Sequence, residues 1–196
     1  MIESLEQIDR AIFLALNGMH SSWGDVIMWY VSTTWIWIPL YAFMLYFAYK
    51  KLGWKYAAII LGGAGMCVLL ADLTSVHLFK NVFLRYRPSH NVELQGLVHN
   101  VVKPNGEVYY GGLYGFVSSH AANVSAIGLF VMLSFKELNR KWFFLIFWMI
   151  LVMYSRIYLG VHYPSDIIFG SSLGLIIGWS VWKLTQKLIT GISVSK

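Results

Sequence analysis

Basic residues, histidines, two serines and one aspartate lie at the ends of apolar stretches in this sequence. The members of this set are Lys80, Arg87, Ser118, Ser119, His120, Arg156, His162 and Asp166. Lysine and arginine would repel a metal ion that histidine and aspartate could otherwise ligate. The same cations suit phosphate oxygens, and histidine can act as a nucleophile or as an acid and base. The residue types therefore predict a phosphate site without a metal.

Long uncharged segments position these residues. Residues 26–49 contain no Asp, Glu, Lys or Arg, which exceeds the roughly 20 residues that a helix needs to cross a bilayer. Four further apolar segments follow, at 56–79, 108–135, 142–159 and 164–184. The hydrophobic fraction of 58% and the charged fraction of 12% exclude an ordinary soluble domain, a disordered chain and a coiled coil. We expect an all-α integral membrane protein, a helical bundle of about five transmembrane helices.

The basic residues between these segments predict the orientation. Nine of the 15 lysines and arginines lie between the first and second segments, between the third and fourth, or at and after the end of the fifth. They are Lys50, Lys51, Lys55, Lys136, Arg140, Lys141, Lys183, Lys187 and Lys196. The positive-inside rule assigns them to the cytoplasm. The amino terminus and all the candidate phosphate-binding residues then lie on the extracytoplasmic side. We expect a multi-pass protein of a bacterial inner membrane, with its active site on the periplasmic face.

Two regions lie outside the spans on that same face. The first 18 residues place apolar side chains at helical spacing among acidic ones, which predicts an amphipathic helix on the membrane surface. The connection at 88–117 contains Asn105-Gly106 between two β-prone stretches, which is typical of a small hairpin. No long linker divides the chain, so residues 1–196 are expected to form a single membrane-embedded domain.

Three motifs in this order resemble the type 2 phosphatidic acid phosphatase superfamily. The first motif, K-x6-R-P, stands as Lys80, Arg87 and Pro88, and the third, S-R-x5-H-x3-D, spans residues 155–166. The middle motif is usually P-S-G-H and stands here as V-S-S-H at residues 117–120. The resemblance covers about residues 80–170. It implies a metal-independent lipid phosphatase that needs no cofactor.

The resemblance also implies a role for each residue. His162 would attack phosphorus and form a phosphohistidine, Asp166 would hold the imidazole, and His120 would protonate the leaving group and then activate water. Pro164 disfavours helical geometry at the residue before it, so His162 is expected to precede a helix. The phosphate-binding set is Lys80, Arg87, Ser118, Ser119 and Arg156, with the backbone amides of the two serines as further donors.

Other polar residues fall outside the motifs. Arg85 is expected to contact lipid phosphates rather than the site. Asp72 lies inside a span, about 12 Å deeper than Lys80 by helical rise, and an interhelical hydrogen bond is favoured over a proton relay. His77 could support the site or be interfacial.

The expected partners are a lipid phosphate and the bilayer, with no nucleic acid and no evident obligatory protein partner. The resemblance allows undecaprenyl diphosphate, phosphatidylglycerophosphate, phosphatidic acid or the phosphates of lipid A, and we favour a polyprenyl diphosphate or a phosphatidyl phosphate. A transport protein and a non-catalytic lipid-binding relative remain as alternatives from other classes. The same residues resemble those of vanadium-dependent haloperoxidases, which are soluble proteins, so five apolar spans make that family improbable.

Overall fold

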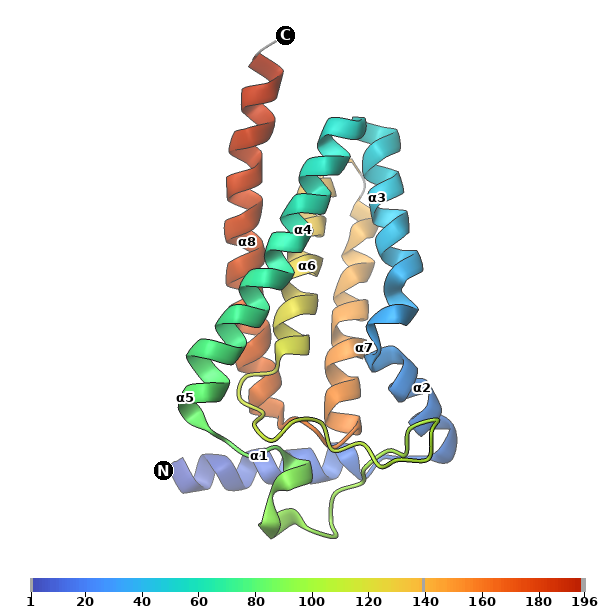
Figure 1. Cartoon of the computed structure of the whole chain (residues 1–196), viewed down its shortest axis with the longest axis vertical. Helices are drawn as coiled ribbons and strands as arrows, with labels where there is room; N and C mark the ends of the chain where they lie inside the picture. The colour runs from blue at the N-terminus through green and yellow to red at the C-terminus, as the bar shows by residue number, and fades with distance from the viewer. Residues whose placement is uncertain (1, 139, 195–196) are drawn as a thin grey trace.

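A computed structural model describes residues 2–138 and 140–194, and this part of the chain is helical with two isolated β-bridges and no strand. Lys196, one of the residues used for orientation, lies outside the described residues. The main helices are α1 (Ile2–Asn17), α2 (Ser22–Ser32), α3 (Ile38–Leu52), α4 (Trp54–Thr74), α5 (Asn81–Phe83), α6 (Ser119–Phe135), α7 (Phe144–Tyr158) and α8 (Pro164–Val194). Five single turns join them, at Thr34–Trp37, Ser75–Lys80, Pro88–His90, Val92–Leu94 and Arg140–Phe143. The long helices run side by side and α1 lies across one end of the bundle (Figure 1).

Within the described residues, three helical stretches are long and apolar enough to cross a membrane: Trp54–Phe83, Arg140–Tyr158 and Pro164–Ile189. A fourth forms if α2 and the stretch Thr34–Leu52, which are bent by 71° relative to each other, are counted together. Helix α6 is apolar but shorter. The membrane-integral, multi-pass class is therefore supported, whereas the count of five spans stays a prediction.

The uncharged sequence predicted a single helix over residues 26–49, but the structure shows two helical segments there. The helix breaks at Thr33, whose backbone is extended and whose hydroxyl donates to the carbonyl oxygen of Tyr30 at 2.8 Å. A β-branched residue with a hydroxyl offers the backbone this alternative to a helical hydrogen bond. The break places the end of α2 beside the carboxyl-terminal end of α7, where the Ser32 hydroxyl accepts a hydrogen bond from Arg156.

Small residues bring α6 and α8 into close contact along their length. A Cβ atom at Gly174 would lie 2.2 Å from the carbonyl oxygen of Ala122, and one at Gly178 would lie 2.4 Å from that of Ala126. Ala122 and Ala126 are completely buried. Glycine at such positions lets helix backbones approach in a way that larger residues prevent. The amino-terminal ends of the two helices, which carry His120 and Asp166, are thereby fixed side by side.

Helix α1 packs against the end of the bundle where α7 ends and α8 begins. Phe13 is fully buried and its ring packs edge-on against Tyr163, with centroids 5.5 Å apart. The Asn17 side chain donates to the carbonyl oxygen of Tyr158 at 2.9 Å, at the end of α7. The predicted helix is present, and its location on a membrane surface remains a prediction.

The outer connection contains the turn that Asn105-Gly106 predicts. Val102 and Val108 form an antiparallel bridge, and the amide of Lys103 donates to the carbonyl oxygen of Glu107 at 2.8 Å. Gly106 adopts a φ of +85°, which glycine tolerates without strain. This turn lies beside α2 at the end of the bundle (Figure 1).

The contact between α6 and α8 yields a stability prediction. Gly174→Ala should destabilise the protein by about 1–3 kcal/mol, because the added methyl group meets backbone and the helices must separate. Gly62→Ala in α4 is the matched control, since nothing lies within 4 Å of its added Cβ. Thermal unfolding in detergent should show a lowered Tm for the first variant and an unchanged or raised Tm for the second. Equal Tm values would contradict the close packing.

Candidate active site

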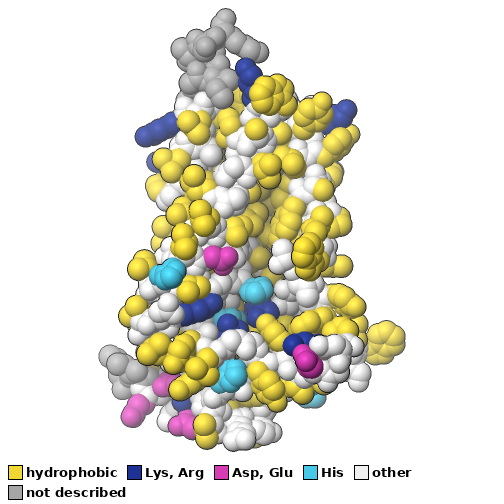
Figure 2. Space-filling view, viewed as in Figure 1, with side chains coloured by type: hydrophobic (Ala, Val, Ile, Leu, Met, Phe, Trp, Pro, Cys, Tyr) yellow, Lys and Arg dark blue, Asp and Glu magenta, His cyan; other side chains and the backbone are white. Residues whose placement is uncertain are grey.

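The predicted site residues meet at the end of the bundle where α6 and α8 begin and α7 ends. Figure 2 shows lysine, arginine and histidine side chains gathered in the lower part of a face that is mostly hydrophobic. Four of the predicted ionisable residues are nearly inaccessible: Arg87 is 8% exposed, Arg156 3%, His162 1% and Asp166 0%. Charges buried to this extent need partners in the protein or in a ligand.

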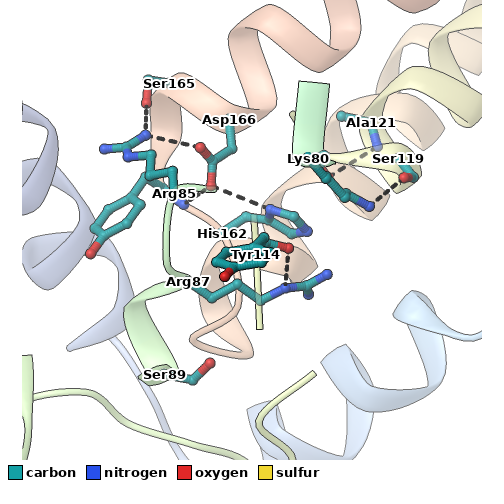
Figure 3. Close-up of polar contacts among 12 residues, drawn as sticks. Lys80, Arg85, Arg87, Ser89, Tyr114, Ser119, Ala121, His162, Ser165 and Asp166 are labelled. Carbon is teal, nitrogen blue, oxygen red and sulfur yellow. Dashed lines mark hydrogen bonds and ion pairs between the residues drawn. The ribbon is translucent and has the colours of Figure 1, made fainter. Parts of the chain in front are cut away.

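His162 and Asp166 form a hydrogen-bonded pair. Nδ1 of His162 lies 3.3 Å from Oδ2 of Asp166, and the same oxygen accepts the backbone N–H of Tyr163 at 3.0 Å (Figure 3). Helix α8 begins at Pro164, so the prediction that His162 precedes the helix is confirmed. With Nδ1 bound to the carboxylate, Nε2 is the ring nitrogen left for chemistry.

The surroundings of His162 favour its neutral form. Burial lowers its pKa well below the usual 6.5, and the positive charges of Arg87, Arg156 and Lys80 lower it further. A backbone hydrogen bond with Gly115 acts in the opposite direction and is weaker. A neutral imidazole held among cations can attack a phosphorus atom whose oxygens those cations neutralise.

Arg87 is held by the glycine-rich run that ends the outer connection. Its Nε donates to the carbonyl oxygen of Tyr114 at 3.1 Å. A Cβ at Gly111 would lie 2.7 Å from Nη1 of Arg87, and one at Gly115 would lie 3.0 Å from Oδ2 of Asp166. Burial lowers the pKa of Arg87 to about 10, so it remains positively charged at neutral pH. The loop thus packs its backbone directly against the arginine and the dyad.

Arg156 has partners that sequence reasoning missed. Nη2 donates to the hydroxyl of Tyr109 at 3.1 Å, and Nη1 donates to the hydroxyl of Ser32. Its Nε is buried without a hydrogen-bond partner among the described residues. A phosphate oxygen would supply the missing acceptor. Tyr109 and Ser32 come from the hairpin and from the break after α2, and neither position carries a motif.

The two serines of the middle motif have different roles. Lys80 Nζ donates to the Ser119 hydroxyl at 2.6 Å, and that hydroxyl also lies 2.7 Å from the Ser75 hydroxyl. Serine at position 119 therefore positions Lys80, which the usual glycine could not do. Ser118 is fully buried, its hydroxyl caps α6 by accepting from the amide of Ala121, and its own amide donates to the carbonyl oxygen of Asp166 at 3.1 Å. The Ser118 amide is thus already occupied.

Arg85 does not serve lipid headgroups, and the expectation that it does is wrong. Its Nη1 donates to Oδ1 of Asp166 at 2.9 Å, and its Nη2 donates to Oδ2 of Asp9 at 2.8 Å (Figure 3 shows the first contact). Asp9 also accepts the backbone amide and the hydroxyl of Ser165 at 2.9 and 2.5 Å. A carboxylate on α1 is thus connected through Arg85 to the His162–Asp166 pair. No sequence periodicity indicates this link, because its members are 76 and 81 residues apart.

Two remaining predictions concern Asp72, on α4, and His77, in the turn Ser75–Lys80 that follows it. The interhelical hydrogen bond of Asp72 is confirmed, because its Oδ1 accepts from Nδ2 of Asn123 on α6 at 3.0 Å. His77 is exposed.

Known proteins match this sequence over most of its length. The model of the PAP2 superfamily matches residues 52–190. A lipid A 4'-phosphatase of Porphyromonas gingivalis is 36% identical over 185 residues, which cover 93% of this chain and 75% of that protein. A lipid A 4'-phosphatase of Bacteroides thetaiotaomicron is 34% identical over 96% of this chain and 81% of its own length. An undecaprenyl-diphosphatase of Sulfolobus acidocaldarius is 29% identical over 88% of this chain and 72% of its own length.

A solved structure has the same fold. The transmembrane PAP2-type phosphatidylglycerolphosphate phosphatase of Bacillus subtilis superposes with a TM-score of 0.67 over 94% of this chain and 87% of its own, at 22% identity. The family match covers well over half of the residues, and two relatives exceed 30% identity over most of the chain. The chain therefore belongs to the PAP2 superfamily of phosphatases.

Proposed function

We propose that this protein hydrolyses a phosphate ester on a membrane lipid through a phosphohistidine at His162. The observation that carries the proposal is the buried His162–Asp166 pair, kept neutral at the imidazole and faced by three cations. The proposal assigns Lys80, Arg87 and Arg156 to the phosphate oxygens, together with the Ser119 hydroxyl. It assigns Ser118 to the helix cap rather than to the phosphate.

The reaction takes two displacements. In the first, Nε2 of His162 bonds to phosphorus, the bond from phosphorus to the leaving oxygen breaks, and His120 gives its proton to that oxygen. In the second, His120 takes a proton from water, the water oxygen bonds to phosphorus, and the P–N bond breaks. Inorganic phosphate leaves and both histidines return to their starting states.

Lipid A phosphate is the substrate that the comparisons favour. Two relatives above 30% identity are lipid A 4'-phosphatases. Undecaprenyl diphosphate, which the sequence analysis favoured together with the phosphatidyl phosphates, is kept as the second candidate because of the 29% identical relative. In this proposal, residues 1–196 form one domain of a bacterial inner membrane, and the site faces the periplasm, level with the lipid headgroups.

The nucleophile has a direct test. His162→Ala should lower kcat for lipid A 4'-phosphate by at least about 10³-fold, because no other group can form the P–N bond. EDTA should leave the rate of the unaltered enzyme unchanged, because the cations of the chain neutralise the phosphate. Phosphate release by purified protein in detergent gives both results.

His77→Ala is the matched control, since His77 is an exposed histidine in the turn Ser75–Lys80 that follows α4. It should retain the activity of the unaltered enzyme. Retention of activity by His162→Ala, or its loss in EDTA, would contradict the mechanism. Binding of lipid without any turnover would favour the lipid-binding alternative.

The pH profile should report the electrostatics of His162. Because its pKa is lowered, the imidazole stays neutral below pH 6.5, and activity should fall only as the pH drops through that lowered value. Arg87→Gln removes one of the charges that lower this pKa, so the acid limb of kcat/KM should move to higher pH, in addition to a loss of rate. An acid limb that stays in place would show that Arg87 does not act on His162.

Arg85 should act as a positioning residue through Asp166. Arg85→Gln should lower kcat about 10- to 100-fold with little change in KM, because it disturbs the dyad and not the phosphate contacts. Asp9→Asn should give a smaller loss of the same kind. Arg85→Lys, which keeps the charge, should recover part of the rate. A change confined to KM would instead place Arg85 on the substrate.

A further inference from the structure

The polar residues of the site continue into the bundle as a line between α4 and α6. Ser75, which lies beside Ser119, donates through its hydroxyl to the carbonyl oxygen of Asp72 at 3.1 Å. One turn further along α6, Asn123 donates to the Asp72 carboxylate at 3.0 Å. By helical rise, Asn123 lies about 6 Å deeper than Ser119. A second polar level therefore exists one helical turn below the phosphate site.

This second level faces a cavity that reaches the active site. The cavity has a volume of about 680 Å³ and lies between α3, α4 and α6. Ser119 and His120 line it at the catalytic end, Asp72 and Asn123 line it next, and apolar residues such as Val68 and Leu45 line the rest. Its shape and its lining suit a hydrocarbon chain that extends from a headgroup held at His120.

Placing the polar side chains of Asp72 and Asn123 at this depth costs free energy unless a ligand forms hydrogen bonds with them. A carboxylate at membrane depth is expensive, and the Asn123 amide that it accepts from is neutral. Oδ1 of Asn123 is buried and has no hydrogen-bond partner among the described residues. Both side chains therefore offer acceptor oxygens, and what the pair lacks is a donor.

We propose that Asp72 and Asn123 bind a hydrogen-bond donor, a hydroxyl or an amide N–H, carried by the substrate lipid close to its phosphate. The apolar part of the cavity then holds the hydrocarbon beyond that donor. This inference rests on the proposed function and narrows its substrate class to phosphorylated lipids with a hydroxylated or amide-linked acyl chain. A polyprenyl chain has no such donor and would leave the pair unsatisfied.

Three synthetic lipids test the pair. They share one phosphorylated backbone and one chain length, and their acyl chains are plain esters, 3-hydroxyacyl esters or amides. The unaltered enzyme should hydrolyse at least one donor-bearing lipid with a kcat/KM about 10-fold or more above that of the plain ester, as expected for a hydrogen bond to a charged acceptor. Asp72→Leu should bring the three values to within about twofold of each other.

The controls separate the possible failures. Leu69→Ala changes an exposed residue of α4 that does not line the cavity, and it should keep the preference. If Asp72→Leu does not fold, Asn123→Leu removes the other member of the pair and should likewise abolish the preference. Equal hydrolysis of all three lipids by the unaltered enzyme, or a preference that survives Asp72→Leu, would overturn the inference and leave the phosphatase proposal standing. Hydrolysis of none of these lipids nor of lipid A 4'-phosphate would overturn both.

Discussion

The buried hydrogen bond between His162 and Asp166 is the interaction on which the rest of the site depends. A carboxylate that is completely inaccessible is costly to bury without compensation, and here it accepts from a histidine, from the Tyr163 amide and from Arg85. Those contacts orient the imidazole so that Nε2 is available, while burial and, after it, the surrounding cations lower its pKa and favour the neutral form. In the proposed mechanism, the same charges serve both the nucleophile and the phosphate-binding site.

The helices position the charged residues at this end of the molecule. Glycines allow α8 to lie against α6, which brings His120, His162 and Asp166 to the same end of the bundle. Helix α1 crosses below them and contributes Asp9, so that Asp166 is held from the amino-terminal end of the chain as well as from its own loop. The break at Thr33 supplies Ser32 to Arg156. Segments far apart in the sequence thus form hydrogen bonds with Arg85, Arg156 and Asp166.

Much of the site could be predicted from the sequence because its residues lie in motifs at the ends of apolar runs. Lys80, Arg87, His120, Arg156, His162 and Asp166 all reach the expected end of the bundle. Asp9 and Arg85 could not be paired in advance, because nothing in local periodicity says which acid a buried arginine will meet. The bend at Thr33 was equally hidden, since an uncharged run indicates membrane depth and not helix continuity. The hydrogen bond from Lys80 to the Ser119 hydroxyl was not predicted either, because the usual motif has glycine at this position.

The stereochemical course at phosphorus tests the central claim most directly. A lipid whose phosphate is made chiral with sulfur and oxygen isotopes would be hydrolysed in isotopically labelled water, and the configuration of the released thiophosphate determined. Two displacements, the first by His162 and the second by water, predict net retention of configuration. Net inversion would show that water attacks the substrate directly and would contradict the phosphohistidine mechanism.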